Sequence, residues 1–322
     1  MIVAIPTFLY IKRDLYYDFG VKDNYSWKYF FQQLGDISTK KLLVSTIDYN
    51  GFIFGSSRST SVYACYLQKK IPDTRFFHYA NWNETIGGIE RKLLLIDSLG
   101  YTIDHVVIYI DTDYSFADNG LVHANDHYLL TSQKRNKYLF SHYKSFFTNM
   151  SMDKLKLLLG LKIEGDGFPD WESDLYTNDP NQLCKDSIIA RYGDIEDSPA
   201  HRNTIDFLKD IGFLYERPGH QLYLPSQISD LEKSVLYNIK SLFEKHNTNF
   251  YVILTPLYDQ LKFSMADQKI LEDCFGDNLY DFSGINDITN NIYNYPDRKH
   301  FQRYISKFIL DSVVKRSRPF IQ

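Results

Sequence analysis

The chain has 322 residues, of which 44% are hydrophobic and 24% are charged, and its formal net charge at pH 7 is -4. This composition excludes a low-complexity disordered chain and is typical of one large globular domain or of a core that carries an inserted cap. The slightly acidic balance argues against a general polyanion-binding surface, so we expect no nucleic-acid partner and favour small or neutral ligands.

Residues 1–45 are interpreted as a separate N-terminal segment. The run from Met1 to Ile11 is apolar and is followed by Lys12 and Arg13. It is shorter than a membrane-spanning helix, and it lacks a basic start and a clear cleavage site. Two interpretations are open. The run is either the end of a membrane anchor, which would allow membrane association, or a core strand or edge segment.

An alternation of strands and helices begins after this segment. Apolar runs and helical periodicity predict strands at 51–55, 75–80 and 105–110, and helices at 59–70 and 85–99. Strands that alternate with helices in this order are typical of an α/β fold with a parallel sheet.

The pattern breaks at residues 115–227, where helix-like stretches such as 138–161 mix with loops rich in Asp, Asn, Pro and Gly. It resumes with helices at 230–245, 266–274 and 301–314 and strands at 249–254 and 279–282. We therefore predict an α/β core made of residues 46–114 and 228–322. Residues 115–227 are predicted to be an inserted cap over the carboxyl ends of the strands, where specificity would be set.

Ser57 lies where the first predicted strand turns towards a helix. The strand runs from Gly51 to Gly55, and Ser56 and Ser57 follow. Such a turn can expose a hydroxyl at the carboxyl end of a parallel sheet, where backbone N–H groups face a developing negative charge. Ser57 is therefore a candidate nucleophile, and its alternative role is that of a helix N-cap.

Asp297 and His300 supply a carboxylate and an imidazole three residues apart. In a tight turn or a first helical turn, residues at this spacing lie on one face, so Asp297 can orient His300 as a base. The spacing is common by chance, and a surface histidine is the plainer interpretation. Its position at the opposite end of an α/β pattern from Ser57 favours a catalytic triad of Ser57, His300 and Asp297.

These motifs resemble the SGNH (GDSL-type) hydrolase superfamily, and within it the bacterial acylesterase-like and acyltransferase-like proteins associated with cell-surface polysaccharides. In that family a Gly-x-Ser after the first core strand carries the nucleophile, and an Asp-x-x-His near the C-terminus carries the acid and base. Residues 55–57 and 297–300 match these motifs. The resemblance is supported by a strand ending in Thr-Pro at 250–256 and by the segment 279–284. It implies a flavodoxin-like three-layer sandwich with a parallel sheet.

The resemblance also implies an oxyanion hole. Its backbone donors would be Ser57 and a residue after the second strand, for which Asn83 is the best placement. A further donor in the family is an asparagine after the third strand, but Asp113 stands at that position here. An ionised aspartate only accepts hydrogen bonds and would repel an oxyanion. We therefore expect Asp113→Asn to raise turnover if Asp113 faces the cleft.

Several polar residues near these motifs have more than one interpretation. Arg58 can clamp an anionic acyl or sugar group, or it can form a structural salt bridge within the insertion. Asp111, Asp113, His123 and His127 are potential metal ligands, the two histidines having the i, i+4 spacing of a helical pair. Scattered loop residues are the favoured interpretation of that set, so we expect no metal and no cofactor.

The cysteines leave the compartment open. Cys65, Cys184 and Cys274 form neither a disulfide framework nor a metal-ligand spacing. The resemblance implies an extracytoplasmic or membrane-anchored location in a bacterium, and a cytoplasmic location is also compatible with the sequence.

The function implied by these features is a serine-dependent acyl-ester hydrolase or O-acyltransferase. Its expected partner is an acylated carbohydrate, a cell-surface polysaccharide or another small ester. The alternative is a catalytically weak glycan-binding or assembly protein that retains the SGNH fold, and the presence of Asp113 keeps this alternative open.

Overall fold

The computed structural model describes residues 4–13, 38–39, 42–43, 45, 47–117, 129, 132–161 and 199–316. The chain divides into two compact units. One contains residues 1–47 and 124–176, and the other contains residues 48–123 and 177–322. The predicted insertion 115–227 is therefore shared between the two units. A cap over the Ser57 cleft stays a prediction.

The first unit contains the helices α1 (Ala4–Arg13), α5 (Ser132–Thr148) and α6 (Met152–Leu158). Tyr10 of α1 is buried, and its ring packs against Tyr143 and Phe146 of α5. The interpretation of the N-terminal run as a strand is wrong, because residues 4–13 form a helix. Only one side of this helix is buried, and that side packs against α5. Within the described residues, no helix combines the length and apolar character needed to cross a membrane.

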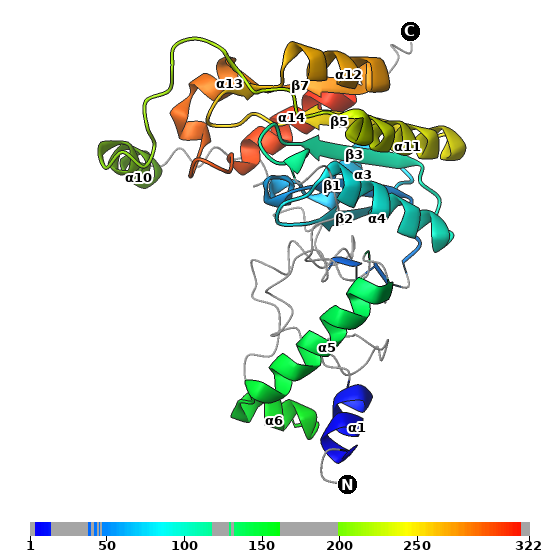
Figure 1. The fold of residues 1–322 in the computed structure, drawn as a ribbon. Coiled ribbons are helices and arrows are strands. Elements are labelled where there is room, and N and C mark those ends of the chain that lie inside the picture. Colours follow the sequence, from blue (N-terminus) through cyan, green and yellow to red (C-terminus); the bar gives the residue numbers. More distant parts are fainter. Residues whose placement is uncertain are drawn as a thin grey trace. The chain divides into compact units, whose positions relative to one another are not determined.

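The second unit is built on a parallel sheet of five strands (Figure 1). The strand order is β2-β1-β3-β5-β7. The strands are β1 (Gly51–Gly55), β2 (Phe76–Ala80), β3 (His105–Ile110), β5 (Asn249–Leu254) and β7 (Leu279–Asp281). All neighbouring strands are parallel. The prediction of an α/β fold with a parallel sheet is confirmed, and this strand order is consistent with a flavodoxin-like sandwich.

Helices cover both faces of this sheet. The main ones are α3 (Ala64–Lys70), α4 (Ile86–Ser98), α11 (Asp230–His246), α12 (Met265–Phe275) and α14 (Arg303–Arg316). Ile53 and Val107 belong to one buried cluster with Leu67 of α3 and Ile309 of α14. On the opposite face Phe250 stacks on Phe243 of α11 with ring centroids 4.8 Å apart. Alternate residues of each strand thus face different helix layers, which explains why the strands are apolar throughout.

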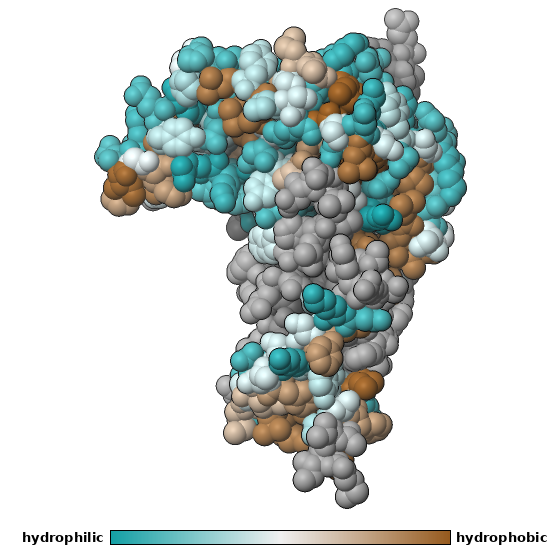
Figure 2. Space-filling view, viewed as in Figure 1, coloured by the Kyte–Doolittle hydropathy of each residue, from teal (hydrophilic) through white to brown (hydrophobic). Residues whose placement is uncertain are grey.

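The remaining elements are short or lie outside the sheet. They are α10 (Pro199–Asp210), β4 (Leu222–Tyr223), β6 (Leu261–Lys262), α13 (Asp287–Asn290) and the 3₁₀ turns η5 (Gly276–Asn278) and η6 (Ile292–Asn294). Strands β4 and β6 form a separate parallel pair. Hydrophilic side chains cover much of the visible face of this unit, and apolar side chains such as the exposed Phe207 and Ile211 gather at α10 (Figure 2).

The helix predicted at 59–70 is interrupted. A 3₁₀ turn, η2, covers Ser57–Ser61, and the α-helix starts only at Ala64. Val62 and Tyr63 between them are extended and buried. Their burial, together with the capping of η2 by the Ser56 side chain, outweighs the helical pattern. The nucleophile candidate is therefore held by a tight turn.

The sheet order places a topological switch point between β1 and β3. The chain passes from β1 to the edge strand β2 and then returns to the other side of β1 as β3. In open parallel sheets, ligands bind at the carboxyl ends of strands next to such a switch. Ser57 follows β1 and Asp111 follows β3, so both flank this crevice.

Candidate active site

The turn that carries Ser57 is possible because Gly55 is small. A Cβ atom at Gly55 would lie 2.7 Å from the Cβ of Ser59 and 2.9 Å from the Cβ of Tyr109. Ser56 then caps η2, since its hydroxyl oxygen accepts from the backbone N–H of Arg58. Ser56 is buried, whereas Ser57 is only half-buried. Of the two serines, Ser57 is the one that a substrate can reach.

Asp297 and His300 form a compact turn. The Asp297 Oδ1 atom accepts from the backbone N–H groups of Lys299 at 2.6 Å and of His300 at 2.9 Å. Its Oδ2 atom lies 2.9 Å from His300 Nδ1. Burial alone would raise the pKa of Asp297, but the hydrogen bond with the His300 side chain and those from the two backbone N–H groups bring it below its ordinary value. The carboxylate is therefore ionised at neutral pH.

The Ser57 hydroxyl lies at the other nitrogen of the same imidazole. Ser57 Oγ is 3.0 Å from His300 Nε2. With the Nδ1 proton donated to Asp297, a neutral imidazole has its Nε2 lone pair free to accept the Ser57 hydroxyl proton. The structure thus brings the three predicted triad residues together in the nucleophile–base–carboxylate order. His300 has a side-chain exposure of 38%, which leaves room for substrate.

Arg58 joins the nucleophile turn to the histidine turn. Its Nε–H donates to the Lys299 carbonyl at 2.6 Å, and its two Nη atoms donate to Asp113 at 2.7 and 2.9 Å. Nη1 also lies 3.0 Å from Asp111. Of the two interpretations of Arg58, the observed contacts are those of a structural salt bridge. The location expected for it was wrong, because its partners Asp111 and Asp113 directly follow β3 and do not belong to the insertion. A guanidinium so engaged is not positioned to clamp a substrate anion.

The charge of Asp113 is therefore paired. Both carboxylate oxygens accept from Arg58 in a bidentate arrangement. The expected repulsion between Asp113 and an oxyanion assumed an unpaired carboxylate, and the bidentate pair weakens that assumption. Asp113 acts here on the position of Arg58, and through Arg58 on the backbone next to His300.

Asp111 is a buried anchor that the sequence pattern did not single out for this role. Its Oδ2 accepts from the Ser56 hydroxyl at 2.5 Å, and its Oδ1 accepts from the Thr255 hydroxyl at 2.6 Å. It thus ties the ends of β1, β3 and β5 together. The available signal was its place directly after β3. Both carboxylate oxygens of Asp111 are used in these hydrogen bonds. The described residues contain no cluster of three potential metal ligands. His123 and His127 lie outside the described residues.

The two proposed backbone donors of the oxyanion hole do not converge in this conformation. The Ser57 N–H donates to the Trp82 carbonyl at 3.4 Å. No described peptide bond is cis, and in a trans peptide the carbonyl and the following N–H point in opposite directions. The Asn83 N–H therefore points away from the Ser57 N–H. Rotation of the Trp82–Asn83 peptide would be needed to make the two donors converge.

The loop that carries this peptide rests on a buried ion pair. Lys92 of α4 and Glu84 are both fully buried and hydrogen-bonded to each other. Glu84 Oε1 also accepts from the Thr85 N–H at 3.2 Å. Gly88 makes room for this carboxylate, because a Cβ atom there would lie 2.2 Å from Glu84 Oε1. Glu84, the residue after the Trp82–Asn83 peptide, is therefore held in place.

A second serine–histidine contact lies beneath the nucleophile turn. Ser59 Oγ is 3.0 Å from His78 Nε2 and donates to the Ser56 carbonyl at 2.8 Å. Burial and the nearby Lys92 charge lower the pKa of His78 to about 3, so this imidazole is neutral. Both side chains are buried. The pair supports the turn and has no access to substrate.

Comparison with known proteins adds no family assignment. No protein-family model matches the chain, and no curated protein matches it.

Proposed function

We propose that this protein is a serine-dependent acyl-ester hydrolase or O-acyltransferase that acts on a carbohydrate. The observation that carries the proposal is the continuous chain of contacts from Ser57 Oγ to His300 Nε2 and from His300 Nδ1 to Asp297. A hydroxyl, a base and an ionised orienting carboxylate in this order are the parts that nucleophilic acyl transfer needs. The carbohydrate class and an extracytoplasmic or membrane-associated location rest on the resemblance to SGNH hydrolases.

The chemistry divides into two half-reactions. Ser57 Oγ attacks the ester carbonyl carbon while its proton moves to His300 Nε2. The tetrahedral intermediate then breaks the bond to the sugar oxygen, which takes the proton back from His300 and leaves as an alcohol. In the second half-reaction, water or a second sugar hydroxyl gives its proton to His300 and attacks the carbonyl carbon of the acyl-Ser57 ester. The bond to Ser57 Oγ then breaks, Oγ takes the proton from His300, and the acyl group leaves as an acid or as a new ester.

The second candidate is a glycan-binding or assembly protein with little catalytic activity. One observation favours it: the Trp82 carbonyl accepts from the Ser57 N–H, which is needed to stabilise an oxyanion. Assays of the purified protein with an aryl acetate and with acetylated oligosaccharides distinguish the enzyme from the glycan-binding protein. Turnover that depends on Ser57 supports the enzyme. Glycan binding without turnover of either ester supports the second candidate.

A further inference from the structure

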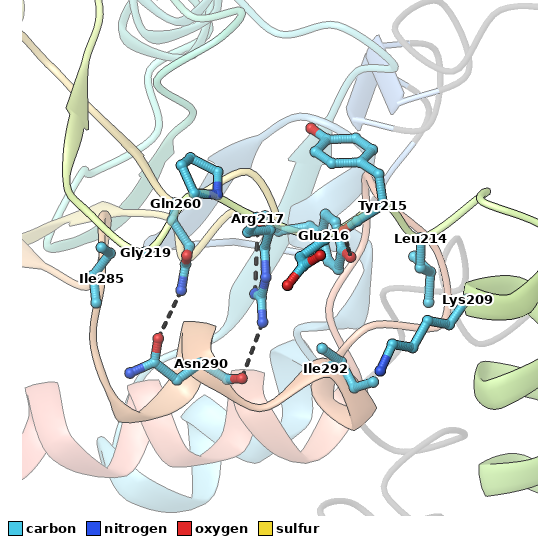
Figure 3. Close-up of a pocket in the computed structure, with 12 residues that line it drawn as sticks. Lys209, Leu214, Tyr215, Glu216, Arg217, Gly219, Gln260, Ile285, Asn290 and Ile292 are labelled. Atoms are coloured by element: carbon cyan, nitrogen blue, oxygen red, sulfur yellow. Dashed lines mark hydrogen bonds between the residues drawn. The ribbon is translucent and has the colours of Figure 1, made fainter.

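A pocket of about 550 Å³ lies in the α/β unit, and neither Ser57 nor His300 nor Asp297 lines it (Figure 3). Its walls come from the segment after α10, the loop between β5 and β6, and the region of α13. The volume falls within the range of small-molecule sites in proteins. Apolar side chains such as Leu214, Ile285 and Ile292 and a group of polar side chains share the lining.

Arg217 is the fixed cation of this pocket. Its Nη1 donates to the carbonyls of Tyr258 and Thr289, and its Nη2 donates to the carbonyl of Asn290 at 3.0 Å. The guanidinium also lies over the Tyr258 ring, 4.7 Å from the centroid. Within the described part of the chain, no carboxylate lies within salt-bridge distance of Arg217. Its charge is held in place by neutral groups only.

Two donors of Arg217 remain for a ligand. Nη1 uses both of its protons on carbonyls and Nη2 uses one. A guanidinium has five N–H groups, so Nε–H and one Nη2–H have no partner among the described residues. Two free N–H groups on a guanidinium that three carbonyls hold in position can donate to the oxygens of a carboxylate.

The neighbouring amides extend this recognition surface. Gln260 Nε2 donates to Asn290 Oδ1 at 2.8 Å, which orients both side chains (Figure 3). The Asn290 Nδ2 protons and the Gln260 Oε1 acceptor then have no partner in the described ranges. Glu216 adds a further acceptor on the pocket wall. These acceptors favour a ligand with several hydroxyl donors, as a sugar has, whereas inorganic phosphate at neutral pH offers only one or two.

The balance of charge also favours an anion with a single charge. Lys209 and Arg217 contribute two positive charges and Glu216 contributes one negative charge. We propose that this pocket binds a carboxylate-bearing sugar unit of the uronic acid type. The carboxylate pairs with Arg217, the hydroxyl groups pair with Gln260, Asn290 and Glu216, and the apolar ring face packs on the aliphatic side chains.

The pocket is linked to the turn that carries Asp297 and His300 through one ring contact. Tyr215 lines the pocket, and Arg298, the residue after Asp297, lies over the Tyr215 ring at 5.6 Å and over the Phe213 ring at 5.1 Å. The binding proposal does not depend on the proposed esterase activity. It holds equally for an enzyme and for a glycan-binding protein.

Calorimetric titration of the full chain with D-glucuronate, D-glucose and inorganic phosphate tests this proposal. Glucuronate and glucose differ at the carboxylate. We expect glucuronate to bind at least about tenfold more tightly than glucose, because the charge-assisted pair with Arg217 is lost with the neutral sugar. Comparable affinities for the two sugars, tighter binding of phosphate than of glucuronate, or no saturable binding of glucuronate would overturn the proposal.

Asn290→Asp is the sharpest variant for the same titration. It keeps the acceptor for Gln260 and the backbone carbonyl for Arg217, but it removes two donors and adds a negative charge beside the guanidinium. Glucuronate affinity should fall about tenfold or more, and Arg217→Gln should have the same effect. Asn278→Asp on η5, which adds the same charge outside the pocket lining, is the matched control. Wild-type affinity in Asn290→Asp would overturn the proposal even if Arg217→Gln failed to fold.

Discussion

Ser57 and His300 are 243 positions apart in the sequence, and their Oγ and Nε2 atoms meet at 3.0 Å. Further hydrogen bonds stabilise this contact. They join the segment made of the Ser57 turn and α3 to the segment made of the His300 turn and α14. Arg58 donates to the Lys299 carbonyl, Ser61 is hydrogen-bonded to Ser306, and Tyr66 donates to Asp311. The two turns are therefore held together by several contacts outside the triad itself.

Asp297 should be required for the orientation of His300. Asp297→Asn keeps the size of the side chain but no longer favours the Nδ1–H form of the imidazole, so we expect turnover of an aryl acetate to fall by about four orders of magnitude. Single-turnover kinetics and thermal unfolding of the variant check this. Turnover within a few fold of wild type in a folded Asp297→Asn variant would mean that His300 is oriented by another group.

The structure reverses the expected effect of substituting Asp113. Both of its oxygens accept from Arg58, and an asparagine would turn an N–H towards the same guanidinium. We expect Asp113→Asn to lower turnover about tenfold, because a charge-assisted bidentate pair that positions Arg58 is lost. Asp113→Ala should act in the same direction. An increase in turnover in both variants would restore the repulsion interpretation drawn from the sequence alone.

The Trp82–Asn83 peptide should limit turnover. If this peptide must rotate before Asn83 can donate to an oxyanion, Asn83→Gly should raise turnover about two- to fivefold, since glycine alters backbone free energies by about 0.5–1 kcal/mol. Asn83→Ala removes the same side chain without this backbone freedom and serves as the control. Equal turnover of the glycine and alanine variants would show that rotation of this peptide does not limit the reaction.

The tie between α3 and α14 should be sensitive to acid. Asp311 accepts from Tyr66 at 2.5 Å and lies 2.9 Å from Lys70 and 2.8 Å from Lys307. Burial alone would raise the pKa of Asp311, but hydrogen bonds from Lys307, Tyr66 and Lys70 lower it to about 2. A depressed pKa stabilises the fold above the ordinary value of 3.8, and this contribution is lost as the pH falls towards 2.

Asp311→Asn should therefore destabilise the protein by about 1 kcal/mol at neutral pH, in the range of exposed ion pairs. Denaturant unfolding at several pH values measures the difference from wild type. The difference should be constant from pH 7 to about pH 5 and should shrink below pH 4. A difference that grows on acidification would contradict the assigned sign.

The strands of the core were predictable because each is a short apolar run with small or polar residues after it, and their alternation with helices indicated a parallel sheet. The start of α3 was not predictable, because the burial of Val62 and Tyr63 in an extended conformation outweighs the local helical pattern. The pairing of Arg58 with Asp113 joins two elements, and no local spacing indicates it. The orientation of the Trp82 carbonyl and the backbone partners of Arg217 leave no signal in side-chain patterns. The oxyanion geometry and the pocket around Arg217 are therefore visible only in the structure.

The central claim is that Ser57 is the nucleophile of a Ser57–His300–Asp297 triad. Treatment with an aryl phosphonate followed by peptide mass spectrometry tests it most directly, with Ser56→Ala and Ser57→Ala compared side by side. We predict a stoichiometric adduct on Ser57 in the wild type and in Ser56→Ala, and no adduct in Ser57→Ala or His300→Ala. An adduct on Ser56, or labelling that persists in Ser57→Ala, would contradict the account.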